Sequence, residues 1–105
     1  MIPIKNIENI VKSYESLEKD LASGKIDRKD FVKKSKEYSN IKEIIKSAKE
    51  YLSFQKDKSD LEKIINDKNN EKEIIELAQN ENLQLLERHK KNEKNIKLFL
   101  LPKDE

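Results

Sequence analysis

The sequence predicts an all-α fold, an elongated antiparallel bundle of three helices that resembles a coiled coil. Two observations favour helices. The 105 residues include only one Gly and two Pro, and the apolar residues recur in steps of three and four. A third observation favours a rod over a globule, because 34% hydrophobic and 42% charged residues supply only a narrow apolar stripe for burial. The net charge of +2 is too small for self-repulsion to keep the chain disordered.

The first helix is expected over about residues 6–23. Its apolar residues follow alternating steps of three and four: Ile7, Ile10, Tyr14, Leu17 and Leu21. This spacing places two apolar residues in each heptad on one face. Asn6 is suited to cap the start of the helix, and Gly24 is suited to end it because glycine adopts the left-handed conformation at little cost.

The second helix is expected over about residues 28–66. Asp27 can accept hydrogen bonds from the free N–H groups of the first turn, and Asp30 stands three residues later, as in an approximate capping box. Ile26 and Phe31 have the spacing of a hydrophobic staple around this start.

The apolar stripe of the second helix is interrupted but meets no helix breaker. We expect it at Phe31, Tyr38, Ile41, Ile45, Ala48 and Leu52, with Val32, Ile44 and Tyr51 beside it, and again at Leu61, Ile64 and Ile65. The intervening residues 55–60 are polar but contain neither Gly nor Pro, so the helix should continue through them. At 1.5 Å per residue, such a helix would be about 58 Å long, which requires a rod.

The third helix is expected over about residues 71–100, after a polar loop at residues 66–70. Asn70 followed by Glu73 predicts a capping box at its start. Its seam is expected at Ile75, Ala78, Asn82, Leu85, His89, Asn92, Ile96 and Phe99. Three of these eight residues are polar, which weakens the seam. Short loops between the helices predict antiparallel neighbours.

The residue types give no support for catalysis, a cofactor or a metal site. The chain has no Cys and one histidine, His89, so it lacks the ligands of a zinc site. Its 21 acidic residues are interspersed with lysines, which is typical of a solvated helix face. A single glycine also excludes a glycine-rich phosphate-binding loop. We therefore expect no catalytic, cofactor-binding or metal-binding residues and no enzyme activity.

Two basic clusters are candidates for contact with phosphate. One contains Lys33, Lys34 and Lys36, and the other contains Arg88, His89, Lys90 and Lys91. Each lies next to a glutamate, and only two residues of the chain are arginines, the side chain preferred for reading bases. Tyr14, Tyr38 and Tyr51 fall on the predicted seams, which favours core positions over base stacking. We expect no sequence-specific nucleic acid binding, while contact with a phosphate-rich neighbour stays open.

The start of the chain does not have the pattern of a targeting segment. The first ten residues, MIPIKNIENI, lack the apolar region of a secretory signal peptide. No apolar run approaches the roughly 18 residues that a membrane span requires. We expect a cytoplasmic protein without membrane contact.

Two segments resemble the N-terminal helical domain of bacterial class I peptide chain release factors. The segment FVKKSKEYSNIKEII at residues 31–45 is similar to the start of that domain's second helix, and KLFLLPKDE at residues 97–105 is similar to its end. The order of a short, a long and a third helix agrees as well. Residues 36–39 together with Pro102, Lys103 and Asp104 resemble the release factor 1 branch of the family more than release factor 2.

The resemblance implies that residues 1–105 form a domain of a longer protein, cut before the decoding and Gly-Gly-Gln domains. The release factor 1 branch of the family is implied to terminate translation at UAA and UAG codons by triggering peptidyl-tRNA hydrolysis, using a Pro-x-Thr tripeptide and a Gly-Gly-Gln loop that this chain lacks. The domain itself is implied to contact the ribosome at the stalk base of the large subunit, the GTPase-associated region. The apolar end at residues 96–101 is expected to contact the remaining domains, or to cause self-association when isolated.

Two other classes of function remain as alternatives. The first is a self-associating coiled-coil scaffold unrelated to translation. The second is the tRNA-binding helical arm of an aminoacyl-tRNA synthetase, which is also an antiparallel hairpin. That arm would need two long helices of similar length and more basic charge, and the break at Gly24 disfavours it.

Overall fold

The computed structural model describes residues 2–102 and contains three helices, as the sequence predicts. They are α1 (Ile4–Ala22), α2 (Arg28–Asn66) and α3 (Lys72–Leu100). The molecule measures 60 × 33 × 20 Å, so it is a rod about as long as α2. Lys103 and Asp104 of the predicted family motif lie outside the described residues.

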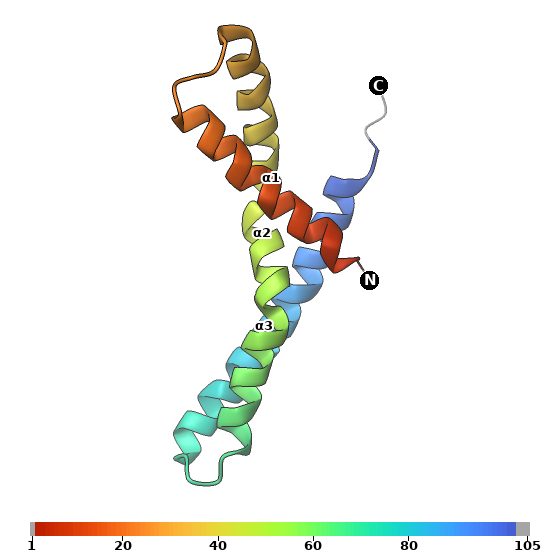
Figure 1. The fold of residues 1–105 in the computed structure, drawn as a ribbon. Coiled ribbons are helices and arrows are strands. Elements are labelled where there is room, and N and C mark those ends of the chain that lie inside the picture. The colour runs from red at the N-terminus through yellow and green to blue at the C-terminus, as the bar shows by residue number, and fades with distance from the viewer. Residues whose placement is uncertain (1, 103–105) are drawn as a thin grey trace.

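The helices form two hairpins that share α2 (Figure 1). α1 crosses the first half of α2 obliquely, whereas α3 runs antiparallel along its second half. The turn between α1 and α2 lies at one end of the rod, and the loop between α2 and α3 lies at the other. The predicted antiparallel bundle is thus confirmed, with its two outer helices packed mainly on different parts of the central one.

The helix starts differ from two of the predicted caps. α1 begins two residues before the expected position, with Pro3 as its N-cap, so Asn6 is not the cap. α3 begins at Lys72 with Glu71 as N-cap, and Asn70 instead donates its side-chain N–H to the carbonyl oxygen of Ile64 at 3.0 Å. Asn70 therefore binds a carbonyl at the end of α2, which also accepts from the Asp67 N–H at 3.4 Å, and does not cap an amide at the start of α3.

The turn between α1 and α2 follows the prediction more closely. Gly24 has a φ of +69°, the left-handed conformation that glycine tolerates best. Asp27 is the N-cap of α2, but its carboxylate makes no capping hydrogen bond; its carbonyl oxygen accepts from the Phe31 N–H at 2.8 Å. Phe31 remains 47% exposed, so the predicted burial of this residue is wrong.

The apolar stripe of α2 changes sides along the helix. In the first half Tyr38, Ile41 and Ile45 are partly buried, and we call them the first stripe. In the second half Phe54, Leu61 and Ile65 form a second stripe. The nine residues from Ile45 to Phe54 correspond to about two and a half turns, so the two stripes lie on opposite sides of α2. α1 therefore packs on one side and α3 on the other.

This change of side corrects the predicted stripe. The sequence predicts a single stripe through Ile45 and Leu52, but both side chains are only partly buried, while Ile44 and Tyr51 are buried. Phe54, absent from the predicted stripe, is 7% exposed. The predicted stripe assumes that α2 buries the same face along its whole length, whereas α2 packs one face against α1 and another against α3.

All three helices meet near the middle of α2, where the first stripe ends and the second begins. We call this site the waist. Its buried residues are Ile2, Ile7, Ile10, Ile44, Ala48, Tyr51 and Ile96, with Val11, Ile41, Leu52 and Phe99 packed against them. Ile7 and Ile96 have no exposed surface. The main hydrophobic core therefore lies at the middle of the rod and joins the start of α1 to the end of α3.

Candidate interaction surface

Two of the three polar residues of the α3 seam, His89 and Asn92, contact side chains of α2, whereas Asn82 Oδ1 is buried without a hydrogen-bond partner. The His89 ring stacks on Phe54 with centroids 3.6 Å apart and on Tyr51 with centroids 4.7 Å apart. One turn along α3, buried Asn92 donates its amide N–H to Glu50 at 2.9 Å. These contacts explain how a seam with polar residues packs against α2, because the two side chains meet aromatic faces and a carboxylate.

A small cavity of about 140 Å³ lies beside His89. Its lining consists of Glu50, Phe54, Asp57, Leu85, Arg88, His89 and Asn92. Burial lowers the pKa of His89, and the nearby Glu93 carboxylate opposes this shift. His89 Nδ1 is buried without a hydrogen-bond partner. The imidazole is consequently held as a neutral aromatic packing residue, in agreement with the seam position predicted from its spacing.

Metal binding and membrane spanning each require a particular geometry, which the described part of the chain does not have. Within residues 2–102, no group of three or more His, Cys, Asp or Glu side chains is arranged to hold a metal ion. Over the same residues, none of the three helices combines the length and apolar character of a membrane span. The surface features that remain are grooves, exposed apolar side chains and charge.

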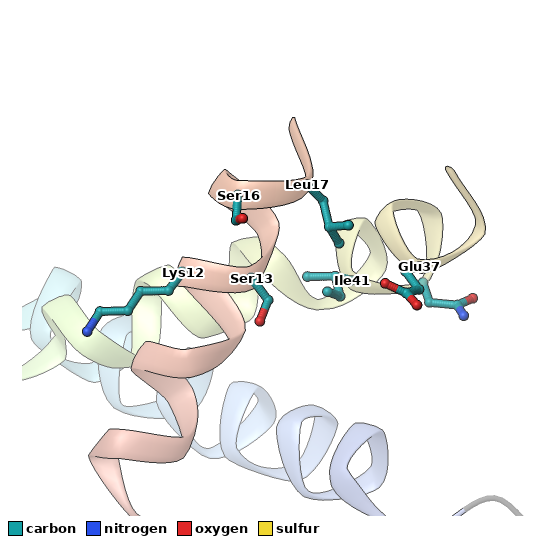
Figure 2. A pocket seen from close by; sticks show the side chains of 7 residues that line it. Lys12, Ser13, Ser16, Leu17, Glu37 and Ile41 are labelled. Atoms are coloured by element: carbon teal, nitrogen blue, oxygen red, sulfur yellow. The ribbon is translucent and has the colours of Figure 1, made fainter. Parts of the chain in front are cut away.

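A groove of about 620 Å³ lies between α1 and α2 (Figure 2). Its lining residues are Lys12, Ser13, Ser16 and Leu17 from α1 and Glu37, Asn40 and Ile41 from α2. Leu17 and Ile41 form its apolar floor, whereas the serines and charged side chains lie at its rim. The groove arises because α1 and α2 diverge from the waist toward their turn.

Polar contacts fix the same two helices beside this groove. The Tyr14 and Tyr38 rings stack with centroids 4.9 Å apart, and their hydroxyl groups lie 2.9 Å apart. Tyr38 donates its hydroxyl proton to Glu18 at 3.0 Å, so the Tyr14 hydroxyl must donate to Tyr38. The neighbouring Tyr14 hydroxyl and Glu18 carboxylate raise the pKa of Tyr38, because a negative carboxylate beside the ring disfavours the charged phenolate. Both tyrosines are thus structural, as their seam positions predict.

Exposed apolar side chains occur at several places outside the core, including Leu77 and Leu83 on α3, the start of α2 and the end of α3. Near the start of α2, Phe31 and Val32 are 47% and 53% exposed. At the end of α3, Leu98 and Leu101 are 58% and 59% exposed and line a groove of about 400 Å³ with Lys90, Lys94 and Lys97. The predicted apolar end therefore divides: Ile96 and Phe99 pack into the waist, while Leu98 and Leu101 face outward.

Comparison with known proteins supports the predicted resemblance. The PCRF domain family matches residues 10–105. The chain is 48% identical to peptide chain release factor 1 of Pelagibacter ubique (strain HTCC1062) over 105 residues, 100% of this chain and 29% of that protein. It is 39% identical to peptide chain release factor 1 of Wolbachia pipientis subsp. Culex pipiens (strain wPip), covering 95% of this chain and 28% of that protein. No solved structure matches the chain significantly.

The chain spans less than a third of the length of these curated relatives. The match nevertheless extends over nearly all of its residues, across both hairpins and the waist that joins them. The helix order and the all-α fold predicted from the resemblance are also those observed. The chain therefore belongs to the PCRF domain family, and its predicted similarity to class I peptide chain release factors is confirmed.

Proposed function

We propose that this chain is a non-catalytic helical domain of a release factor 1 and that it helps to hold that protein on the ribosome. The observation that carries this proposal is the 48% identity to a release factor 1 over the full 105 residues. The parent protein would terminate translation at UAA and UAG codons in the cytoplasm, as the resemblance implies. The hydrolysis itself would depend on other domains, because this chain has one glycine and no Gly-Gly-Gln loop.

The proposed contact is the stalk base of the large ribosomal subunit. The shape supports this role, because a rod 60 Å long can reach a site distant from the decoding and catalytic domains. The mixed charge and the exposed apolar side chains at the start of α2 and the end of α3 also favour a binding domain over an enzyme. The surface rather than any internal cavity would then carry the function.

The second proposed partner is the remainder of the release factor. Leu98 and Leu101 would pack against it, because they project from the end of α3 beside the waist and are 58% and 59% exposed here. In isolation the same two leucines would favour weak self-association. The double substitution Leu98→Ser and Leu101→Ser should abolish any concentration-dependent dimer seen by analytical ultracentrifugation while leaving helix content unchanged.

Co-sedimentation with bacterial ribosomes tests the proposed function. The 105-residue chain should pellet with ribosomes that carry a stop codon in the A site, and excess full-length release factor 1 should displace it. The same mixture should release no peptide from peptidyl-tRNA. Absence of ribosome binding would refute the proposal, and stop-codon-dependent release by the chain alone would refute its non-catalytic assignment.

A further inference from the structure

The two ends of the rod carry opposite net charge. Residues 25–36, at the turn between α1 and α2, contain six basic side chains and two acidic ones, a net charge of +4. Residues 57–81, around the loop between α2 and α3, contain four basic and eight acidic side chains, a net charge of −4. We call these the basic tip and the acidic tip. Figure 1 shows them at opposite ends of the long axis.

The basic charge at the first tip is largely free of internal ion pairs. Lys34 pairs with Asp20 of α1 at 2.9 Å, which raises the pKa of Lys34 and holds α1 against α2. The other basic side chains of the tip are all exposed: Lys25, Arg28, Lys29, Lys33 and Lys36. The ion pairs recorded within residues 2–102 involve none of these five. Their charge is therefore available to an external anion.

An exposed aromatic ring accompanies this charge. Phe31 is 47% exposed and lines a shallow groove of about 500 Å³ with Val32, Ser35, Lys36, Ser39 and Asn40. The groove thus places a ring face next to a lysine and to hydroxyl and amide groups that can donate hydrogen bonds. Phosphate contacts by lysine combined with base stacking on an aromatic ring are typical of proteins that bind single-stranded or looped RNA.

We propose that the basic tip contacts the phosphate backbone of RNA, with Phe31 available to stack on an unpaired base. The inference rests on the proposed ribosomal function and specifies which end of the rod meets RNA. Lysines supply five of the six basic side chains, which suits a contact that positions the domain without reading sequence. The acidic tip repels phosphate, so the rod is oriented with its α1–α2 turn toward RNA.

A charge-reversal experiment with a matched control tests this assignment. The tip variant carries Lys29→Glu, Lys33→Glu and Lys36→Glu, and the control variant carries Lys63→Glu, Lys68→Glu and Lys72→Glu. All six lysines are exposed, so both variants change the net charge by the same amount without touching the core. Binding is measured to protein-free large-subunit ribosomal RNA across a salt series, to poly-glutamate and to whole ribosomes. A third variant, carrying Lys29→Gln, Lys33→Gln and Lys36→Gln, removes the charge without reversing it, and circular dichroism reports helix content.

We expect the tip variant to bind the RNA about tenfold or more weakly at low salt, with a log–log salt dependence shallower by about two to three. The control variant should change RNA affinity by about twofold at most. Phe31→Ala should weaken binding to the RNA but not to poly-glutamate, because only a base can stack on the ring.

The RNA-binding measurements overturn the inference if the unmodified chain does not bind RNA, if the tip and control variants lose affinity equally, or if the tip variant keeps its affinity. Equal affinity for poly-glutamate and RNA would overturn it as well. The last would indicate an acidic protein as the partner. Ribosome binding that persists in the tip variant would refute the RNA contact and leave the proposed function standing. Tip-dependent RNA binding without ribosome binding would refute the proposed function and leave the RNA contact standing.

Discussion

His89 lies at a seam position that an apolar residue would normally occupy, and its ring is used as an aromatic surface. It stacks on Phe54 and Tyr51, and its Nδ1 has no hydrogen-bond partner. Stacking at these distances favours an uncharged ring, since a buried imidazolium would lose hydration. The Glu50, Asp57 and Arg88 side chains line the adjacent cavity, and no recorded hydrogen bond joins any of them to His89.

This environment predicts that the folded domain loses stability as the pH falls below about 6.5, the ordinary pKa of histidine. The pKa of His89 is lowered from its ordinary value of 6.5, so the unfolded chain takes up the proton first as the pH falls. The free energy of unfolding therefore decreases as the pH falls through this range, and the loss is complete once the pH lies below the folded-state pKa of His89. Urea denaturation at a series of pH values should show the loss, and His89→Gln should remove it.

The acid range below pH 5 serves as an internal control. There the Lys97 hydrogen bond lowers the pKa of Glu93, so protonation of Glu93 should destabilise both the unmodified chain and the His89→Gln variant. A slope between pH 7 and pH 5 that survives in His89→Gln would show that another group is responsible.

Single residues also show where sequence patterns mislead. Phe31 is apolar and stands at a staple position, but α1 has diverged from α2 at that end and the ring stays largely exposed. Phe54 escapes prediction for the opposite reason: its neighbours from residue 55 to residue 60 are polar, and only the tertiary contact with α3 buries it. Periodicity identifies helix positions that could be buried, but the packing partner decides which of them are.

At the scale of the elements, helix boundaries depend on local chemistry and are largely predictable. α2 occupies the expected residues 28–66, and the other two helices differ from expectation by one or two residues at their ends. Gly24 follows α1 closely, and its left-handed conformation lets the chain reverse there. The capping hydrogen bonds are less predictable, since Asn70 can serve either the helix before it or the helix after it.

Gly24→Ala should destabilise the domain by about 1 kcal/mol, since a Cβ atom makes the left-handed conformation costly. Outside Gly24 and its two chain neighbours, no heavy atom lies within 4 Å of the position that this Cβ would take, so the loss would come from the backbone and not from a clash. Gly24→Asn should cost less than Gly24→Ala, because asparagine tolerates this conformation better. Thermal unfolding followed by circular dichroism measures both, and equal losses would contradict the backbone explanation.

At the scale of the whole molecule, the waist makes two hairpins into one unit. The cluster joins residues of α1, α2 and α3, although the outer helices otherwise pack on different halves of α2. The fold class and the helix order are predictable because they depend on spacing and breakers. The waist is not, because it requires knowing that the start of α1 and the end of α3 meet on the same part of α2.

Ile96→Ala should destabilise the domain by about 2–5 kcal/mol, because Ile96 has no exposed surface and truncation would leave a cavity. Leu98→Ala, two residues away and 58% exposed, should change stability by less than about 0.5 kcal/mol. Since the waist couples the hairpins, amide hydrogen exchange in Ile96→Ala should accelerate in α1 as well as in α3. Acceleration confined to α3 would mean that the hairpins open independently.

The candidate surface is predictable only in part. The lysine cluster at residues 33–36 is visible in the sequence, as is the apolar character of residues 96–101. The opposite charge of the two tips becomes meaningful only once the chain is seen to place them at opposite ends of the rod. Likewise, Leu98 and Ile96 look equivalent in sequence and are separated only by which side of α3 the waist covers.

The change from the first stripe to the second sets the angle around the α2 axis between the two hairpins. Each residue added between Ile45 and Phe54 would swing α3 around the α2 axis by about 100° relative to α1, whereas seven added residues would restore the original bearing to within about 20°. In relatives with a different number of residues in this part of α2, α1 and α3 would therefore leave α2 in different relative directions, unless the difference is seven residues. The number of residues between Ile45 and Phe54 therefore sets the overall shape of the domain.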